Sequence, residues 1–108
     1  MAETLRVQLK KGVMDLCVLA LLSRQEAYAY EIASRLAEDV GMGEGTIYPL
    51  MRRLQDDGFV TTYLVESNSG PTRKYYQLTA AGRKAYVAQR AEWTDFVKSI
   101  NRALGDHQ

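Results

Sequence analysis

Histidine and cysteine are almost missing from this sequence, which has one of each among its 108 residues. The histidine is His107, near the C-terminal end, and the cysteine is Cys17. These two residues cannot assemble a nucleophile–base pair or a metal cluster, and no glycine-rich phosphate loop is present. We therefore predict a protein that is not an enzyme, that is not a metal sensor, and that needs no cofactor.

Long apolar runs are also missing. The longest covers residues 16–22 and contains Cys17, whereas a membrane span needs roughly 18 residues. A lone cysteine in such a run excludes an intrachain disulfide and predicts a small buried thiol. The N-terminal residues lack the basic-then-apolar order of a secretory signal. We expect a cytoplasmic protein with no membrane partner.

The sequence has no strong excess of either charge, since 14 lysines and arginines face 13 acidic residues and the net charge is +1. Nucleic-acid-binding proteins often carry a marked basic excess. If this chain binds DNA, its positive charge must be local. The length fits one domain with an appended element.

Three stretches in the first half show helical spacing. Over residues 5–24 the apolar positions broaden to nearly all sides after Val13, which predicts a helix covered by protein. A second helix is predicted over residues 27–40, and the glycines of residues 41–43 end it. In the third helix the apolar residues Ile47, Leu50, Met51 and Leu54 fall at i, i+3, i+4 and i+7. Pro49 places its start near residues 44–46, because proline lacks a backbone donor, and Gly58 supplies the stop.

The period changes after Gly58. Residues 59–65 and 74–78 are rich in β-branched and aromatic side chains, and residues 66–72 are rich in turn formers, which predicts a hairpin with a polar tip. Thr79 is suited to cap a final helix that reaches about Ala103. The short glycine-containing connection between the second and third helices matches a helix-turn-helix. We predict an α+β, mostly α fold: a winged helix-turn-helix followed by a long C-terminal helix.

Three segments carry a resemblance to a known family. GTIYPLMRRLQDDGFV, over residues 45–60, resembles the recognition helix of the PadR family of transcriptional regulators. GPTRKYYQLTAAG, over residues 70–82, resembles its wing and the helix start that follows, and YAYEI, over residues 28–32, is similar to the opening of its second helix. In that family one or two basic residues usually follow the first wing glycine. Pro71 and Thr72 depart from this pattern, which removes one expected phosphate contact.

The resemblance implies a repressor that binds double-stranded operator DNA as a homodimer. The single helix after Thr79 is similar to the short form of the family, whose members dimerise through the last and first helices. Several of those members bind flat aromatic compounds between the subunits, flanked by a tryptophan from each. By this resemblance residues 1–78 are the DNA-binding domain, residues 79–108 are the dimerisation helix, and a planar aromatic effector is expected.

The third helix is expected to enter the major groove, where arginine pairs with guanine or phosphate and hydroxyl groups bind phosphate oxygens. After the hairpin tip, Arg73 is the stronger wing contact, because Lys74, its neighbour on the strand, faces the opposite side. Lys10 and Lys11 are considered as further phosphate contacts. The predicted DNA-binding residues are Thr46, Tyr48, Pro49, Arg52, Arg53, Arg73 and Lys74.

The last helix has an apolar stripe around Trp93 and no later helix to cover it. Since a long exposed stripe is an aggregation liability, we expect burial against a second copy near a twofold axis. Two indole rings there can stack on a planar ligand or form a plain dimer core, and Asp15 is considered as a cation-attracting group. The predicted dimer contacts are Leu5, Leu9, Trp93, Phe96, Val97, Ile100 and Leu104. The predicted ligand-pore residues are Trp93, Leu16, Ala20, Tyr86 and Val97. The last four are assigned to the pore walls from their position on the helices and from the family resemblance.

A second hypothesis is a winged-helix module that binds protein instead of DNA. The weak net charge favours it, whereas Arg52, Arg53 and Arg73 at the expected places count against it. Duplex binding that weakens steeply with salt separates the two hypotheses.

Overall fold

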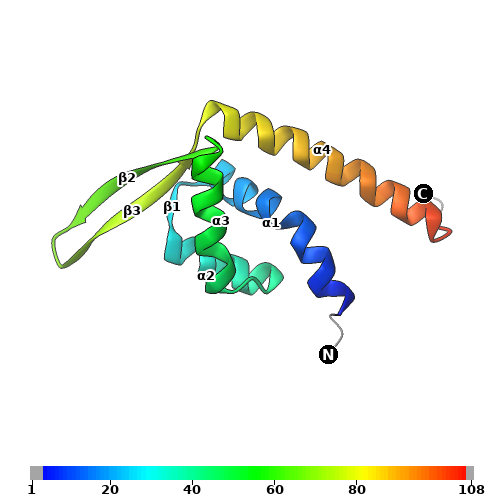
Figure 1. Cartoon of the computed structure of the whole chain (residues 1–108), viewed down its shortest axis with the longest axis horizontal. Coiled ribbons are helices and arrows are strands. Elements are labelled where there is room, and N and C mark those ends of the chain that lie inside the picture. Colours follow the sequence, from blue (N-terminus) through cyan, green and yellow to red (C-terminus); the bar gives the residue numbers. More distant parts are fainter. Residues whose placement is uncertain (1–3, 107–108) are drawn as a thin grey trace.

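The computed structural model describes residues 4–106, and His107 lies outside them. Within this range four helices and a three-stranded sheet form the predicted winged helix-turn-helix with a long last helix (Figure 1), so the predicted fold class is confirmed. The elements in order are α1 (Leu5–Arg24), β1 (Ala27–Tyr28), α2 (Ala29–Val40), α3 (Glu44–Asp56), β2 (Val60–Ser67), β3 (Gly70–Leu78) and α4 (Ala80–Ala103).

The first helix divides into a buried half and an exposed half. The hydroxyl of Thr4 caps it by accepting from the N–H of Val7, and the helix begins and ends where the sequence predicts. Its C-terminal half supplies Val18, Leu19, Leu21 and Leu22 to the core. Towards the N-terminus Leu5 and Leu9 are exposed, while the other large apolar side chains are half-buried.

The second helix starts later than the sequence predicts. Residues Ala27 and Tyr28 form β1, which pairs antiparallel with β3 opposite Tyr76 and Tyr75, so α2 begins only at Ala29. The prediction of a helix from residue 27 was wrong, because a two-residue strand has no periodicity of its own and depends on a distant partner. Gly41, at φ 73°, ends α2 as expected.

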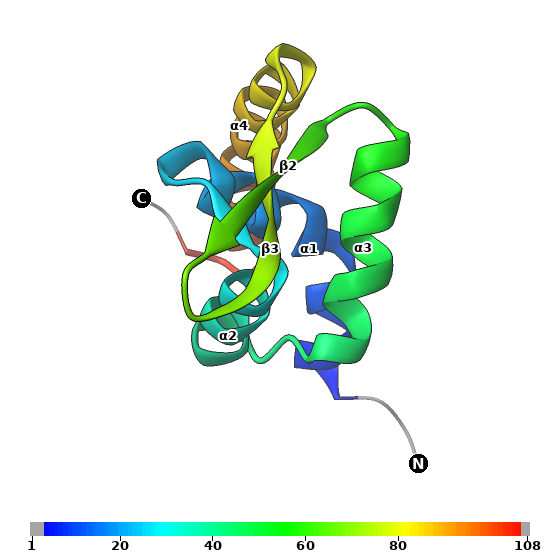
Figure 2. The ribbon, with the colours of Figure 1, turned by 90° about the vertical axis from the view of Figure 1, so that its left-hand side faces the viewer.

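The hairpin is longer than predicted, and its turn is shorter. The sheet order is β1-β3-β2, and the β2–β3 ladder extends to the pair Ser67–Gly70, so the wide loop predicted over residues 66–72 was wrong. Its turn residues mark only the tip and a register shift between Val65 and Ser67. Figure 2 shows this hairpin projecting beside α3.

The core stripe of α3 is as predicted. Ile47, Leu50, Met51 and Leu54 are all buried, and they pack in one cluster with the buried residues of α1, α2 and the sheet. Pro49 is the sixth residue of α3 and exposed, which is further into the helix than a first-turn proline. Because one face of α3 is fully used by the core, the opposite face must point outwards.

A close backbone contact sets the start of α4. Thr79 accepts from the N–H of Gly82 at 3.0 Å and donates to the carbonyl of Gly58 at 2.6 Å. A Cβ atom on Gly82 would lie 2.0 Å from the carbonyl oxygen of Phe59. Gly82 is also the only buried residue of this 24-residue helix. Ala85 and Tyr86 still pack against the core, and the rest of α4 runs past α1 (Figure 1).

Gly82→Ala is expected to destabilise the protein by about 1–3 kcal/mol, because the methyl group forces apart two backbone segments. Thermal and urea unfolding at fixed protein concentration measure the effect. Gly45→Ala is the matched control, since a Cβ atom there meets nothing within 4 Å. Equal stability of the two variants would show that α4 does not need this close approach.

Candidate functional site

The outer face of α3 gathers the residues that the sequence assigns to DNA. Thr46, Tyr48, Pro49, Arg52 and Arg53 are all exposed, and Tyr48 is 47% exposed despite its large ring. Figure 2 shows α3 at the edge of the molecule, with the hairpin projecting next to it. The helix and the hairpin therefore frame one continuous surface.

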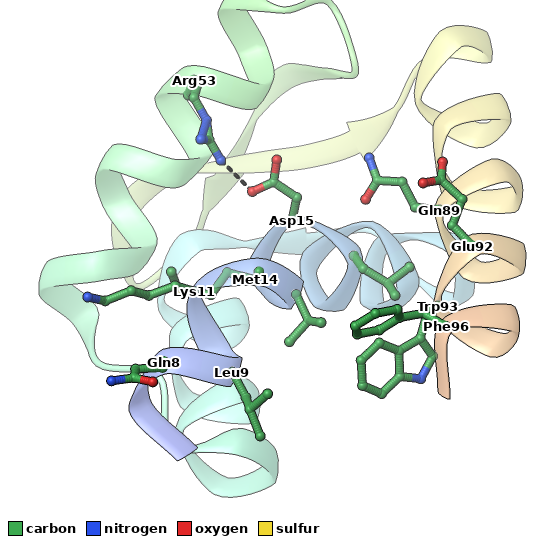
Figure 3. Close-up of a pocket in the computed structure, with 13 residues that line it drawn as sticks. Gln8, Leu9, Lys11, Met14, Asp15, Arg53, Gln89, Glu92, Trp93 and Phe96 are labelled. Carbon is green, nitrogen blue, oxygen red and sulfur yellow. Dashed lines mark hydrogen bonds and ion pairs between the residues drawn. The ribbon is translucent and has the colours of Figure 1, made fainter. Parts of the chain in front are cut away.

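The two adjacent arginines of α3 have different surroundings. Arg53 forms an ion pair with Asp15 of α1 (Figure 3), and the side chains are 54% and 39% exposed. Arg52 lies within electrostatic range of Tyr76 of the sheet: burial and then Tyr48 raise the pKa of that phenol, and the charge of Arg52 works against the rise. Neighbours on a helix point in directions about 100° apart, so the two arginines do not share one direction.

The two wing cations lie on opposite faces of β3. The guanidinium of Arg73 lies 4.6 Å from the ring centre of Tyr28, at the start of α2. Lys74 shares its strand face with Tyr76, and burial followed by the nearby Tyr48 of α3 raises the pKa of Tyr76. Lys74 is therefore on the side of β3 that faces α3. Both cations lie in β3, after the turn residues 66–72 that the sequence predicts, and Arg73 is part of the strand as well as Lys74.

An aromatic cluster at the base of the hairpin was not predicted. The rings of Tyr63 and Tyr75 stack at 5.7 Å, Tyr75 meets Tyr28 at 5.4 Å, and Tyr28 meets Tyr30 at 6.5 Å. Tyr63 donates to the carboxylate of Glu26, and this hydrogen bond is the main cause that raises its pKa to about 12. The cluster ties the hairpin to the start of α2. Its tyrosines come from four different elements, so the cluster forms only once β1 and β2 pair with β3.

The side chain of Lys10 forms a hydrogen bond within the fold. Its ammonium group donates to the carbonyl of Gly41 at 3.2 Å, where a cation stabilises the C-terminal end of α2. Lys11 lies in the groove described next. The extra phosphate contacts considered for these lysines stay predictions.

A groove of about 750 Å³ lies between α1 and α4, with Arg53 of α3 at its edge (Figure 3). Of the predicted ligand-pore residues, Trp93 and Leu16 are in its lining. Ala20, Tyr86 and Val97 are half-buried and are not in that lining. The lining is Gln8, Leu9, Lys11, Gly12, Val13, Met14, Asp15, Leu16, Arg53, Gln89, Glu92, Trp93 and Phe96.

The predicted dimer residues form a largely exposed apolar surface on α1 and α4. Trp93 is 44% exposed and Phe96 is 55% exposed, and both point from α4 towards α1 (Figure 3). Val97 alone is half-buried. The exposed members of this surface are Leu5, Leu9, Trp93, Phe96, Ile100 and Leu104.

The model of the transcriptional regulator PadR-like family matches residues 18–88, which include the helix-turn-helix, the hairpin and the start of α4. The chain belongs to the PadR-like family. Solved PadR-like structures agree with this assignment over nearly the whole chain. A PadR-like regulator from Bacillus cereus is 33% identical with a TM-score of 0.82, over 90% of this chain and 96% of that chain. A Streptococcus transcriptional regulator is 32% identical with a TM-score of 0.81, over 94% of this chain and 98% of that chain.

The structure of another relative was solved in complex with DNA. The structure of Bacillus subtilis PadR in complex with operator DNA has a TM-score of 0.65 at 28% identity, over 71% of this chain and 46% of that chain. In the sequence comparison this negative transcriptional regulator is 30% identical over 76 residues, which are 67% of this chain and 42% of that protein. This chain therefore spans less than half of that relative's length.

PadR-like proteins are transcriptional regulators and not enzymes, and this holds for the present chain. Among residues 4–106 no group of three or more histidine, cysteine or acidic residues is arranged to bind a metal ion. None of the helices in this range is long and apolar enough to cross a membrane.

Proposed function

We propose that this PadR-like regulator represses transcription by binding double-stranded operator DNA as a homodimer, and that a planar aromatic ligand releases it. The observation that carries the proposal is the joint surface of α3 and the hairpin. It presents hydroxyl groups and cations, while the other face of α3 is sealed into the core. The complex of Bacillus subtilis PadR with operator DNA supports a duplex as the partner.

In this proposal α3 reads the major groove. Thr46 and Tyr48, in the first two turns, bind phosphate oxygens and fix the position of the helix, whereas Arg52 contacts guanine or phosphate. Lys74 reaches the backbone on the side of α3, and Arg73 does so on the side of α2. Pro49 lies between these contacts and packs against the groove wall.

Charge sets the expected strength of one reading surface. Within α3 and its C-cap, Glu44, Asp56 and Asp57 offset the two arginines, but they lie at the two ends and leave a basic middle. One module then binds with moderate affinity. A second module on a second half-site supplies the rest, and half-sites about 34 Å apart match a symmetric dimer.

The dimer in this proposal forms through α4 and the first half of α1. Residues 1–78 carry the reading surface and residues 79–108 carry most of the apolar contact. Burying Trp93, Phe96 and Ile100 against a second copy removes from water a surface that one chain leaves exposed. The twofold axis then brings two copies of the α1–α4 groove close together.

The effector in this proposal occupies the groove beside Trp93. Its volume of about 750 Å³ is in the range of small-molecule sites, and its walls are apolar with a few charged groups. A ligand that changes the angle between two α4 helices changes the separation of the reading helices. Since half-site spacing tolerates little error, the affinity for operator falls.

Duplex binding tests the first part. A duplex selected by the wild-type protein from a random-sequence pool is expected to bind with an affinity that falls steeply with salt. Arg52→Gln should weaken binding about ten-fold and reduce the salt slope by about one, whereas Arg35→Gln, an exposed change on α2, should change neither. Failure to select any duplex, with the fold intact, would leave the protein-interaction module as the better hypothesis.

Fluorescence tests the second part, because Trp93 is the sole tryptophan. Planar aromatic compounds are expected to quench it saturably and to release the selected duplex over the same concentration range. Trp93→Phe keeps an apolar ring at this position and should raise the concentration needed for release at least ten-fold. Release that is unchanged in Trp93→Phe would place the ligand elsewhere. Quenching without release would make the groove a binding site with no control of DNA.

A further inference from the structure

One ion pair joins the wall of the groove to the reading helix. Asp15 and Arg53 both line the groove, yet Asp15 belongs to α1 and Arg53 to α3 (Figure 3). In this structure Arg53, and not the adjacent Arg52, points to Asp15 and pairs with it. The guanidinium of Arg53, which the sequence assigns to DNA, is thus paired with a carboxylate of α1.

The ion pair is easily exchanged. Both side chains are partly exposed to solvent, and pairs of this kind contribute little to stability. The carboxylate of Asp15 already accepts a planar nitrogen donor from Arg53. An amidinium group presents the same fork of N–H donors and can replace the guanidinium without rearranging the carboxylate.

The surroundings of Asp15 fit a cation that carries an aromatic body. Trp93 and Phe96 supply ring surface on the α4 side, and Glu92 adds a second carboxylate to the lining. The other cation of the lining, Lys11, extends away from Trp93 (Figure 3). Charge and shape therefore favour a planar aromatic cation over an anion of the same size.

We propose that the Asp15–Arg53 pair couples the groove to DNA binding. A planar aromatic amidinium binds in the groove and displaces Arg53 from the carboxylate of Asp15, and the ion pair between α3 and α1 is lost. Arg53 is then a positioning residue and not a DNA contact. The inference rests on the proposed function, since it names the ligand class and the link by which that groove acts on the reading helix.

The ligand part is tested with 2-naphthamidine and its neutral isostere 2-naphthamide, by quenching of Trp93 in the protein alone. The amidine is expected to bind the wild type about ten-fold more tightly than the amide. Asp15→Asn should abolish this preference. Arg53→Gln should raise the affinity for the amidine several-fold, because it removes the competing cation, and Arg35→Gln should leave both affinities unchanged. A lower amidine affinity in Arg53→Gln, or no preference in the wild type, would overturn the exchange of partners.

The DNA part is tested with the same variants and the selected duplex. Asp15→Asn and Arg53→Gln are expected to weaken binding by similar factors of about three to ten, with unchanged salt slope, and the double variant should be no weaker than either. If Arg53 contacts phosphate, Arg53→Gln lowers the salt slope by about one, while Asp15→Asn, which removes a negative charge, strengthens binding. That pattern would overturn the coupling role.

The two failures are distinguishable. A wild-type protein that selects no duplex contradicts the proposed function, whatever the amidine does. A protein that binds duplex and is released by neutral aromatics as readily as by the amidine keeps the proposed function and contradicts this inference. Melting temperatures of all variants within a few degrees of the wild type show that each result concerns a folded protein.

Discussion

The long helix α4 cannot bury its apolar side within one chain. Its N-terminus is held by the close approach of Gly82 to Phe59, and nothing beyond Gly82 is buried along the rest of its length. Four large apolar side chains are 42–72% exposed in one chain, those of Trp93, Phe96, Ile100 and Leu104. Hydrophobic surface of this extent favours association with a matching surface, and a second copy presents one by symmetry. The proposed dimer, the proposed ligand groove and the spacing of the reading helices all depend on this constraint.

Packing also decides where the charged residues of the winged helix-turn-helix lie. One face of α3 fills the core, so its remaining side chains point outwards. Arg53 pairs with Asp15 at the groove, and the adjacent Arg52 points about 100° away from it. A chain with a net charge of +1 can therefore carry the proposed basic reading surface and also an ion pair between α3 and α1.

Much of this arrangement could be predicted from the sequence, because it depends on local patterns. The spacing of Ile47, Leu50, Met51 and Leu54 identified the buried face of α3, and Thr79 identified the start of α4. What was missed depends on distant partners: β1 exists only through its pairing with β3, and the Tyr63–Glu26 bond and the Asp15–Arg53 pair join residues far apart in the chain. Adjacent arginines look equivalent in a sequence, and only packing on α1 separates them.

The distance between the two reading helices in the free protein tests the central claim most directly. A spin label on Gln55→Cys, an exposed position of α3, in a Cys17→Ala background reports it by double electron–electron resonance. A dimer built through α4 and α1 is expected to give one population centred near 34 Å, one turn of duplex DNA, broadened by the label linkers. Absence of a dipolar signal, or a distance far from one turn, would contradict an assembly that sets two reading helices for two half-sites.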